Sequence, residues 1–205
     1  MKSEILIGVL CLSVAAVTVC GCKKQEGTVD NLKKAITGET TASAKYAAYA
    51  KKAKEEKFAK IALLFEAASR AESIHAKKHT VVLEAAGARM DPITPRFTVK
   101  STKENLQDAI SGESYEIDTM YPEFIKKAAD EKKDDAVASF DAAWKVEKKH
   151  KELYTAALSA LEKNDMKALP AAYSVCPVCG NTFGANVPAV CEICGERKQD
   201  FIVVK

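Results

Sequence analysis

Cysteine is missing from the whole middle of this 205-residue sequence, which excludes a fold held together throughout by disulfides. The seven cysteines fall into two groups. Three belong to the first 22 residues, and the others lie close together near the C-terminus: Cys176, Cys179, Cys191 and Cys194. A disulfide scaffold would spread its cysteines over the chain, so these four thiols need another explanation.

An excess of charge of one sign is also missing. Lysine and arginine number 31 and aspartate and glutamate 28, which leaves a net charge of +3. The lysines are interleaved with acidic residues and form no isolated basic block, so nucleic acid is not an expected partner. We interpret the lysine-rich stretches as solvated faces of helices.

Charged residues are absent from Ile5 to Cys22, and two lysines follow at once. This run fits a secretory signal better than a spanning helix, which needs about 20 apolar residues. Its end, Val-Cys-Gly-Cys, resembles a bacterial lipoprotein cleavage box with Cys22 as the lipidated residue. We expect residues 1–22 to be the leader of an exported lipoprotein, held at the membrane only by its lipid anchor, on the periplasmic or cell-surface side. The alternatives are an uncleaved anchor and, favoured by Glu4, a leader without function on a cytoplasmic protein.

Glycine and proline are scarce between residues 30 and 164, where alanine, lysine, glutamate and leucine predominate. Apolar residues recur every three or four positions, so this region is predicted to be helical. The interruption is at residues 87–102, where one glycine and two prolines prevent a continuous helix. Ser101 or Thr102 then offers a new N-cap.

The helical region repeats itself. "AITGETTASAKY" matches "AISGESYEIDTMY" at an offset of 74, and "FEAASRAESIH" matches "FDAAWKVEKKH" at an offset of 75. An unbroken helix as long as either half would measure about 80 Å, so each half must fold back on itself. We expect the turns near residues 55–57 and 131–133. Two hairpins joined by the proline-containing loop make a four-helix bundle over residues 23–164, followed by a linker at residues 165–172.

Histidine is nearly absent, yet two of the three histidines each follow a glutamate by three residues, at matching places in the two repeats. Positions i and i+3 share one face of a helix. The first helix of each half adds a glutamate that follows a glycine. The four helices therefore offer Glu39, Glu72 with His75, Glu113, and Glu147 with His150.

This set of residues is the one that dinuclear iron or manganese sites use in ferritin-like bundles. Two divalent ions about 3.5–4 Å apart repel each other, and bridging carboxylates offset their charge. Without metal, each charged glutamate in a core would carry a penalty on the order of several kcal/mol. A chance arrangement is the alternative, which the agreement with the repeat disfavours. His79, one turn beyond His75, is expected at the surface or beside the ligands.

The C-terminal segment contains "CPVCG" and "CEICG". Two Cys-x-x-Cys-Gly knuckles supply four thiolates, and Gly180 and Gly195 allow the tight path of the chain. Such a set binds zinc or a single iron ion, and the tail alone favours zinc because zinc ribbons are commoner. Disulfide bonds are the remaining alternative.

The motifs "GETTASAKY", "AESIH", "GESYEIDTMYPEF", "VEKKH" and "CPVCG…CEICG" together resemble those of the rubrerythrin family over residues 30–205. The resemblance implies a mainly α-helical chain, with a ferritin-like four-helix bundle from two repeated hairpins and a small rubredoxin-like domain at residues 173–205. Family members often have glycine at the hairpin turns, where Lys57 and Lys132 stand here. A left-handed lysine costs on the order of 1 kcal/mol, unless the turn geometry differs. "CEIC" also lacks a usual proline.

The resemblance also assigns roles to single residues. It implies that Glu116 and His75 exchange on one iron as its oxidation state changes, and that two tyrosines lie near the site. The implied set is Glu72 and Glu147 as bridges, Glu39 with Glu116 or His75 on one iron, Glu113 with His150 on the other, and Tyr46 and Tyr121 beside them.

The activity implied by the resemblance is reduction of hydrogen peroxide to water by a non-haem diiron peroxidase, in defence against oxidative stress. Electrons would come through an iron centre held by the four thiolates, from a reductase or rubredoxin-like carrier that uses NAD(P)H, which favours iron over zinc in the tail. The family is commonly homodimeric, with the rubredoxin-like domain of one subunit near the diiron site of the other. The alternatives are a ferroxidase or iron-sequestering protein and a non-enzymatic, lipid-anchored bundle with a zinc knuckle.

Overall fold

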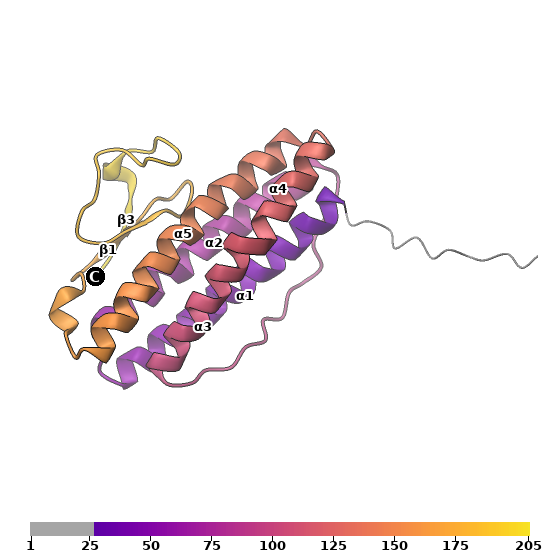
Figure 1. Cartoon of the computed structure of the whole chain (residues 1–205). Helices are drawn as coiled ribbons and strands as arrows, with labels where there is room; N and C mark the ends of the chain where they lie inside the picture. Colours follow the sequence, from indigo (N-terminus) through magenta and orange to yellow (C-terminus); the bar gives the residue numbers. More distant parts are fainter. Residues whose placement is uncertain (1–26) are drawn as a thin grey trace, which may run out of the picture.

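The computed structural model describes residues 27–205, so the expected leader at residues 1–22 lies outside the described part of the chain. Most of the described residues are helical, as predicted (Figure 1). α3, η1 and α4 continue one another as one rod, so four rods make the bundle. The helices are α1 (Thr28–Glu55), α2 (Ala59–Ala85), α3 (Thr102–Tyr115), the π-helix η1 (Glu116–Met120), α4 (Tyr121–Asp130) and α5 (Asp134–Glu162).

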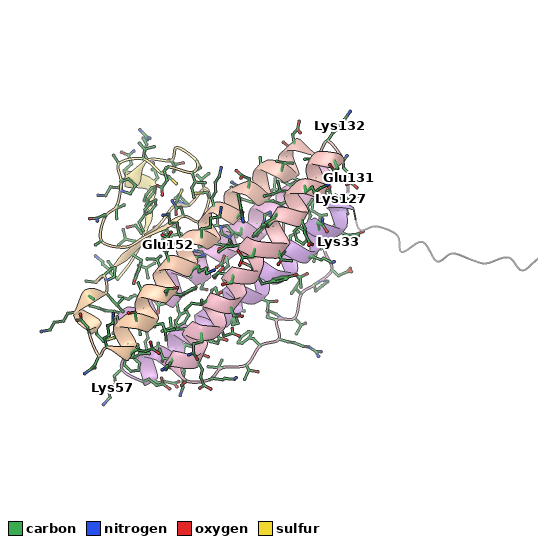
Figure 2. All side chains as sticks on the ribbon, viewed as in Figure 1. Lys33, Lys57, Lys127, Glu131, Lys132 and Glu152 are labelled. Atoms are coloured by element: carbon green, nitrogen blue, oxygen red, sulfur yellow. The ribbon has the colours of Figure 1, made fainter. Side chains whose placement is uncertain are left out.

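Both hairpins turn where the sequence predicts, with a lysine in the left-handed conformation. Lys57 has φ 67° and Lys132 has φ 55°. Figure 2 shows these two lysines at opposite ends of the bundle. The backbone therefore takes the path that glycine would allow, and each lysine Cβ carries the strain that glycine avoids.

Glycine at these turns should stabilise the protein. We expect Lys57→Gly and Lys132→Gly each to raise the free energy of unfolding by about 0.5 kcal/mol, because relief of the strain exceeds the added entropy of the unfolded chain. Lys51→Gly, at an exposed position inside α1, is the control and should lower it by about 1 kcal/mol. Urea unfolding of the metal-loaded protein measures all three. A lower free energy of unfolding in Lys57→Gly or Lys132→Gly would show that the left-handed lysines are not strained.

A glutamate next to each turn caps a helix of the other hairpin. Glu56 accepts a hydrogen bond from the N–H of Thr102 at the start of α3, and Glu131 accepts one from the N–H of Thr28 at the start of α1, both at 2.9 Å. A helix N-terminus has unpaired N–H groups and the positive end of the helix dipole, which stabilise a carboxylate. These hydrogen bonds lower the pKa of both glutamates. The same contact thus joins the hairpins at both ends.

The connection between the hairpins, residues 86–101, has no regular secondary structure and runs along the outside of the bundle (Figure 1). Ser101 begins α3 as its N-cap, and its Oγ accepts a hydrogen bond from the N–H of Glu104. The carboxylate of Glu104 accepts one from the N–H of Ser101 in return. The new helix therefore begins where the sequence offers a capping box.

The π-helix η1 explains why the offset between the repeats changes. The first-helix glutamates match at an offset of 74, whereas the tyrosines that follow, Tyr46 and Tyr121, match at 75, so the second half has one extra residue between them. A π-helix closes each hydrogen bond over one more residue than an α-helix, and η1 lies in this interval. Within η1 the carbonyl of Ile117 accepts a 2.9 Å hydrogen bond from Trp144 Nε1. The wider turn accommodates the insertion, and it begins at Glu116.

Two apolar clusters fill the bundle and leave a polar layer between them. One cluster contains Tyr46, Phe65 and Tyr154, and the other contains Ile36 and Phe140. Along α1 the buried glutamate at position 39 lies between members of the two clusters. The polar layer is therefore enclosed on both sides by packed aromatic and aliphatic side chains.

The chain after α5 forms a small β domain against the side of the bundle (Figure 1). It consists of a 3₁₀ turn η2 (Met166–Ala168), β1 (Tyr173–Val175), β2 (Thr182–Phe183), a 3₁₀ turn η3 (Lys198–Asp200) and β3 (Ile202–Val204). The sheet is antiparallel in the order β2-β1-β3, with Ser174 opposite Phe183 and Val203. β1 contacts α2, and β2 contacts α2 and α5. Among residues 27–205, no helix has the length and apolar character needed to cross a bilayer.

Candidate metal centres

Six buried side chains from the four rods meet in the polar layer. They form two groups of four potential ligands, and within each group the ligand atoms lie within 4.8 Å of one another. Each side chain is at most 1% exposed. The groups are Glu39, Glu72, His75 and Glu147, and Glu72, Glu113, Glu147 and His150. Glu72 and Glu147 belong to both groups, which is the position of bridging ligands.

The other predicted residues surround this cluster. The hydroxyl of Tyr46 donates a 2.7 Å hydrogen bond to Glu113, and the hydroxyl of Tyr121 donates one to Glu39. Glu116 lies at the start of η1, half-buried and outside both groups of four. Burial and the carboxylates nearby raise its pKa. The structure therefore places His75 among the ligands and Glu116 beside them.

Both histidines of the cluster turn Nδ1 toward the carboxylates and Nε2 away from them. Nε2 of His75 lies 3.0 Å from the carbonyl oxygen of Cys179, and Nε2 of His150 lies 3.1 Å from Oγ1 of Thr182. A carbonyl only accepts, and Thr182 donates its own hydrogen to the carbonyl of Gly180, so both Nε2 atoms carry a hydrogen. Each Nδ1 lone pair then faces carboxylates. An outer hydrogen bond of this kind fixes the tautomer of a metal-binding histidine.

The inner atoms of the cluster lack hydrogen-bond partners. Oε2 of Glu39, both carboxylate oxygens of Glu72, Oε1 of Glu147 and Nδ1 of His75 are buried without one. Nδ1 of His75 lies 3.0 Å from Glu72 and 2.9 Å from Glu147, which sets lone pair against lone pair unless a cation lies between them. Two divalent ions carry four positive charges, and the two groups together hold four carboxylates. The donors thus fit a diiron site in number and kind.

Protons take the place of cations when no metal is bound. Burial lowers the pKa of His75 and His150, but the carboxylates of Glu147 and Glu72 outweigh it and hold both pKa values well above the usual range. Burial raises the pKa of Glu39 to about 8. Binding of divalent cations must therefore release protons from the cluster.

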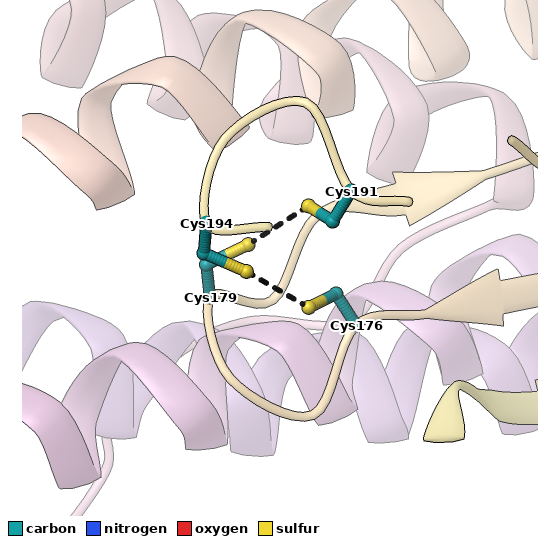
Figure 3. Close-up of side chains that lie close together, drawn as sticks. All are labelled: Cys176, Cys179, Cys191 and Cys194. Atoms are coloured by element: carbon teal, nitrogen blue, oxygen red, sulfur yellow. Dashed lines mark hydrogen bonds between the residues drawn. The ribbon is translucent and has the colours of Figure 1, made fainter. Parts of the chain in front are cut away.

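The two knuckles bring the four C-terminal thiols together. Sγ of Cys176 lies 3.4 Å from that of Cys194, and Sγ of Cys179 lies 3.5 Å from that of Cys191 (Figure 3). A disulfide has a sulfur–sulfur distance of about 2.05 Å, so the disulfide alternative is wrong for this structure. Four sulfurs at about 2.3 Å from one metal ion lie roughly 3.8 Å apart. The thiols are therefore arranged as a tetrathiolate site, of which Cys194 is the exposed member.

The first knuckle lies directly on the diiron cluster. Gly180 has φ 80°, and a Cβ there would lie 2.6 Å from Nε2 of His75 and 3.2 Å from the carbonyl of Ala71. Glycine is required at this position for both conformation and space. Gly195 has φ 79° in the second knuckle, with open space around its Cβ position. The hydrogen bond from His75 to Cys179 therefore joins the two centres within one chain, whereas the resemblance implied an approach between subunits.

The sequence did not reveal the surroundings of His79. This side chain is fully buried and hydrogen-bonds to Tyr121 at 3.1 Å and to Ser139 at 2.8 Å. Of the two expected positions, the surface is therefore wrong and the place beside the ligands is confirmed. The place of His79 one turn beyond His75 was compatible with a position beside the ligands. Ser139 comes from another helix, and no motif marks it.

The fold and the two centres define a ferritin-like diiron-carboxylate bundle that carries a rubredoxin-like tetrathiolate domain. A family profile described as rubrerythrin matches residues 30–158. Nigerythrin from Nitratidesulfovibrio vulgaris is 38% identical over 175 residues, which is 85% of each chain. Rubrerythrin-2 from Clostridium acetobutylicum is 33% identical over 187 residues, covering 87% of this chain and 97% of that one. The chain belongs to the rubrerythrin family.

Solved structures agree with this assignment. Nigerythrin in its fully reduced, all-ferrous state matches with a TM-score of 0.79 and 34% identity, covering 99% of this chain and 100% of that one. Symerythrin from Cyanophora paradoxa, with a TM-score of 0.58 and 21% identity over 66% of this chain and 86% of that one, shares the fold alone. The family and the two ligand sets together make this chain an iron protein with a diiron site and an iron–tetrathiolate site.

Proposed function

We propose that this protein reduces hydrogen peroxide to water and receives the electrons through its tetrathiolate centre. The observation that carries the proposal is a buried ligand set for two metal ions with a tetrathiolate site hydrogen-bonded to it through Cys179 and His75. A pair of ferrous ions supplies two electrons and Lewis acidity to the oxygen–oxygen bond. Membership of the rubrerythrin family supports the same chemistry.

The chain's own residues provide a closed site for a small substrate. Glu72 and Glu147 belong to both ligand groups, so they would hold two divalent cations in one closed site, where one peroxide could be bound. The hydroxyls of Tyr46 and Tyr121 orient the first-helix glutamates, and the buried ligands exclude bulk water. Glu116 is half-buried and lies on the wider turn of η1, and this position supports an exchange between Glu116 and His75 as ligands of one iron.

The electron path in this proposal runs through one chain. It passes from Sγ of Cys179 along that residue to its carbonyl oxygen, across the 3.0 Å hydrogen bond, and through the imidazole of His75. Cys194 is exposed and offers the donor an approach. A reductase or rubredoxin-like carrier that draws on NAD(P)H would supply the electrons, and the protein would act as a homodimer, which sedimentation equilibrium tests.

Iron analysis with visible spectra tests the proposal as a whole. We expect two irons in the bundle and one in the tetrathiolate site, and a ferric-thiolate absorption band that is bleached on reduction and returns on addition of peroxide. Iron uptake far above three per chain would favour ferroxidase or storage activity. Zinc alone, without the absorption band, would favour the non-enzymatic alternative and overturn the proposal.

Cys179→Ser separates the two centres chemically. The variant keeps the backbone carbonyl that accepts from His75 but loses one thiolate, so the tetrathiolate iron and its absorption band should be lost. The bundle should retain two irons, and the reduced variant should still consume about one equivalent of peroxide per diiron site. Multiple turnovers with an NAD(P)H-linked donor should stop. Unchanged multiple turnover would contradict the relay without touching the diiron assignment.

A further inference from the structure

The six ligand side chains of the diiron cluster are shielded from bulk water. If the proposed function holds, each peroxide reduced to two water molecules consumes two electrons and two protons. The cluster's six side chains are at most 1% exposed, so bulk water does not reach them directly. A hydrogen-bonded row of groups that can both accept and donate would carry protons from the surface to the site.

A row of hydrogen-bonded side chains leads outward from Glu39. The hydroxyl of Tyr121 donates to Glu39, Nε2 of His79 lies 3.1 Å from that hydroxyl, and Nδ1 of His79 lies 2.8 Å from Oγ of Ser139. Glu39, Tyr121 and His79 are fully buried, and Ser139 is 5% exposed. The row thus links α1, α4, α2 and α5 without a break.

The outer end of the row opens into a surface cavity between α2 and α5. This cavity has a volume of about 380 Å³. It is lined by Ser139, Lys78 and Asp135 and by four apolar side chains, Val81, Val82, Ala85 and Ala138. It has room for several water molecules. Asp135 is exposed, lies one turn before Ser139 on the same face of α5, and places a carboxylate at the opening.

The hydrogens of the row all point inward. Tyr121 uses its hydrogen for Glu39, so its oxygen must accept from Nε2–H of His79. Nδ1 of His79 then carries a lone pair and accepts from the hydroxyl of Ser139. Burial is the largest cause that lowers the pKa of His79, to about 3, and it favours the neutral imidazole that the hydrogen bonds to Tyr121 and Ser139 require. A neutral imidazole is the form that accepts at one nitrogen and donates at the other.

We propose that Ser139, His79 and Tyr121 form a proton relay from this cavity to the diiron site. A hydronium ion in the cavity protonates Oγ of Ser139 while the hydrogen of Ser139 moves to Nδ1 of His79. The Nε2 hydrogen of His79 moves to the oxygen of Tyr121, and the hydrogen of Tyr121 moves to Oε1 of Glu39. Each of the three relay residues gains one proton and loses one, so each ends neutral. The proton then rests on Glu39, which would pass it to an oxygen of the peroxide before the next one arrives.

The second proton follows after the row has been reset. Rotation of the two hydroxyls and exchange of the imidazole tautomer restore the inward direction. The two protons and the two electrons from the ferrous pair then convert the two oxygens of one peroxide into two water molecules. Tyr121, His79 and Ser139 are relay residues in this scheme, because none of them touches the metal ions or the peroxide.

The internal duplication provides a comparison within the same molecule. In the other half, Tyr46 holds Glu113 as Tyr121 holds Glu39. The position that matches His79, at an offset of 75, is Tyr154, whose hydroxyl is buried without a hydrogen-bond partner. The position that matches Ser139, at the same offset, is Leu64, which is fully buried. The row from Tyr121 therefore continues to a serine at the cavity, whereas the matching positions of the other half hold a tyrosine and a buried leucine, and a leucine cannot pass on a proton.

Nuclear magnetic resonance tests the relay independently of activity. The chain has only three histidines, so zinc-loaded protein labelled with ¹⁵N-histidine gives a simple spectrum. We expect His79 to be neutral and protonated at Nε2, with a ring hydrogen that exchanges with water at least about tenfold faster than in Ser139→Ala. Ser159→Ala, elsewhere on α5, is the matched control and should leave the exchange unchanged. Protonation at Nδ1, or equal exchange with and without Ser139, would overturn the relay.

Rapid mixing of the reduced iron protein with peroxide tests the same relay in turnover. Glutamine at position 79 donates and accepts hydrogen bonds but does not pass a proton between its polar atoms, so His79→Gln should slow reoxidation about tenfold or more, at unchanged iron content and melting temperature. His79→Phe should be equally slow. A wild-type rate in His79→Gln would reduce His79 to a structural role and overturn the proposal. A wild-type protein inert to peroxide would instead contradict the proposed function, while the resonance experiment still decides on the relay.

Discussion

Replacement of Glu147 by alanine should remove both irons of the bundle and abolish peroxide reduction. Glu147 belongs to both ligand groups, is fully buried, and lies 2.9 Å from Nδ1 of His75 and 2.8 Å from Nδ1 of His150. Its loss takes a ligand from both cations and leaves three carboxylates for four positive charges. We expect the iron content to fall from three to one per chain, and peroxide consumption to fall to that of iron-free controls.

Iron analysis combined with the ferric-thiolate spectrum measures this outcome, because the tetrathiolate centre reports that the chain has folded. Glu147→Gln, which keeps the volume and removes the charge, should lose iron in the same way. Glu152→Ala, at an exposed position of the same helix (Figure 2), is the control and should behave as wild type. Peroxide turnover that survives in Glu147→Ala would mean that the reaction takes place elsewhere.

Gly180→Ala should disconnect the two centres. A left-handed alanine costs on the order of 1–2 kcal/mol. The new Cβ would also lie 2.6 Å from Nε2 of His75, so the first knuckle must move away from the bundle and the hydrogen bond from His75 to Cys179 must lengthen. A misplacement of about 1 Å can cost on the order of 100-fold in the rate of a step that depends on geometry. We expect electron transfer from the tetrathiolate iron to the oxidised diiron site to slow by at least that factor.

Gly195→Ala is the matched control for this prediction. Gly195 has φ 79°, almost the same as Gly180, in the second copy of the same motif, but its Cβ position is open. The two variants therefore share the backbone strain and differ only in the contact with the diiron cluster. Stopped-flow oxidation of the reduced tetrathiolate centre by peroxide measures both rates, and iron analysis confirms that each keeps three irons. Equal rates in the two variants would show that the contact between the centres does not control electron transfer.

The sequence predicts most of the diiron site because its ligands follow helical spacing. Three residues along a helix bring Glu72 to the same face as His75, and the duplication repeats the pair at Glu147 and His150. The tetrathiolate site is equally local, since each knuckle is a short turn. The geometry of these features is determined by residues close together in the sequence, so it can be predicted from a single sequence.

The parts that the sequence does not predict depend on contacts between distant segments. The hydrogen bond between His79 and Ser139 joins residues 60 positions apart, and that between His75 and Cys179 joins residues 104 apart. Gly180 could be read as a turn residue, but its closeness to the diiron cluster follows only from where the β domain packs. The cap that Glu56 forms on α3 is of the same kind, because no rule of local spacing relates the two hairpins.

The reciprocal caps, Glu56 on Thr102 and Glu131 on Thr28, have the form of an isologous interface. In a two-fold symmetric dimer, the same patch on each partner makes the same contact twice, and here both partners are halves of one polypeptide. The external connection at residues 86–101 then serves as a tether that raises the local concentration of one hairpin near the other. The duplicated chain thus behaves as a pseudo-dimer. Its two hairpins are covalently connected, so dilution cannot separate them.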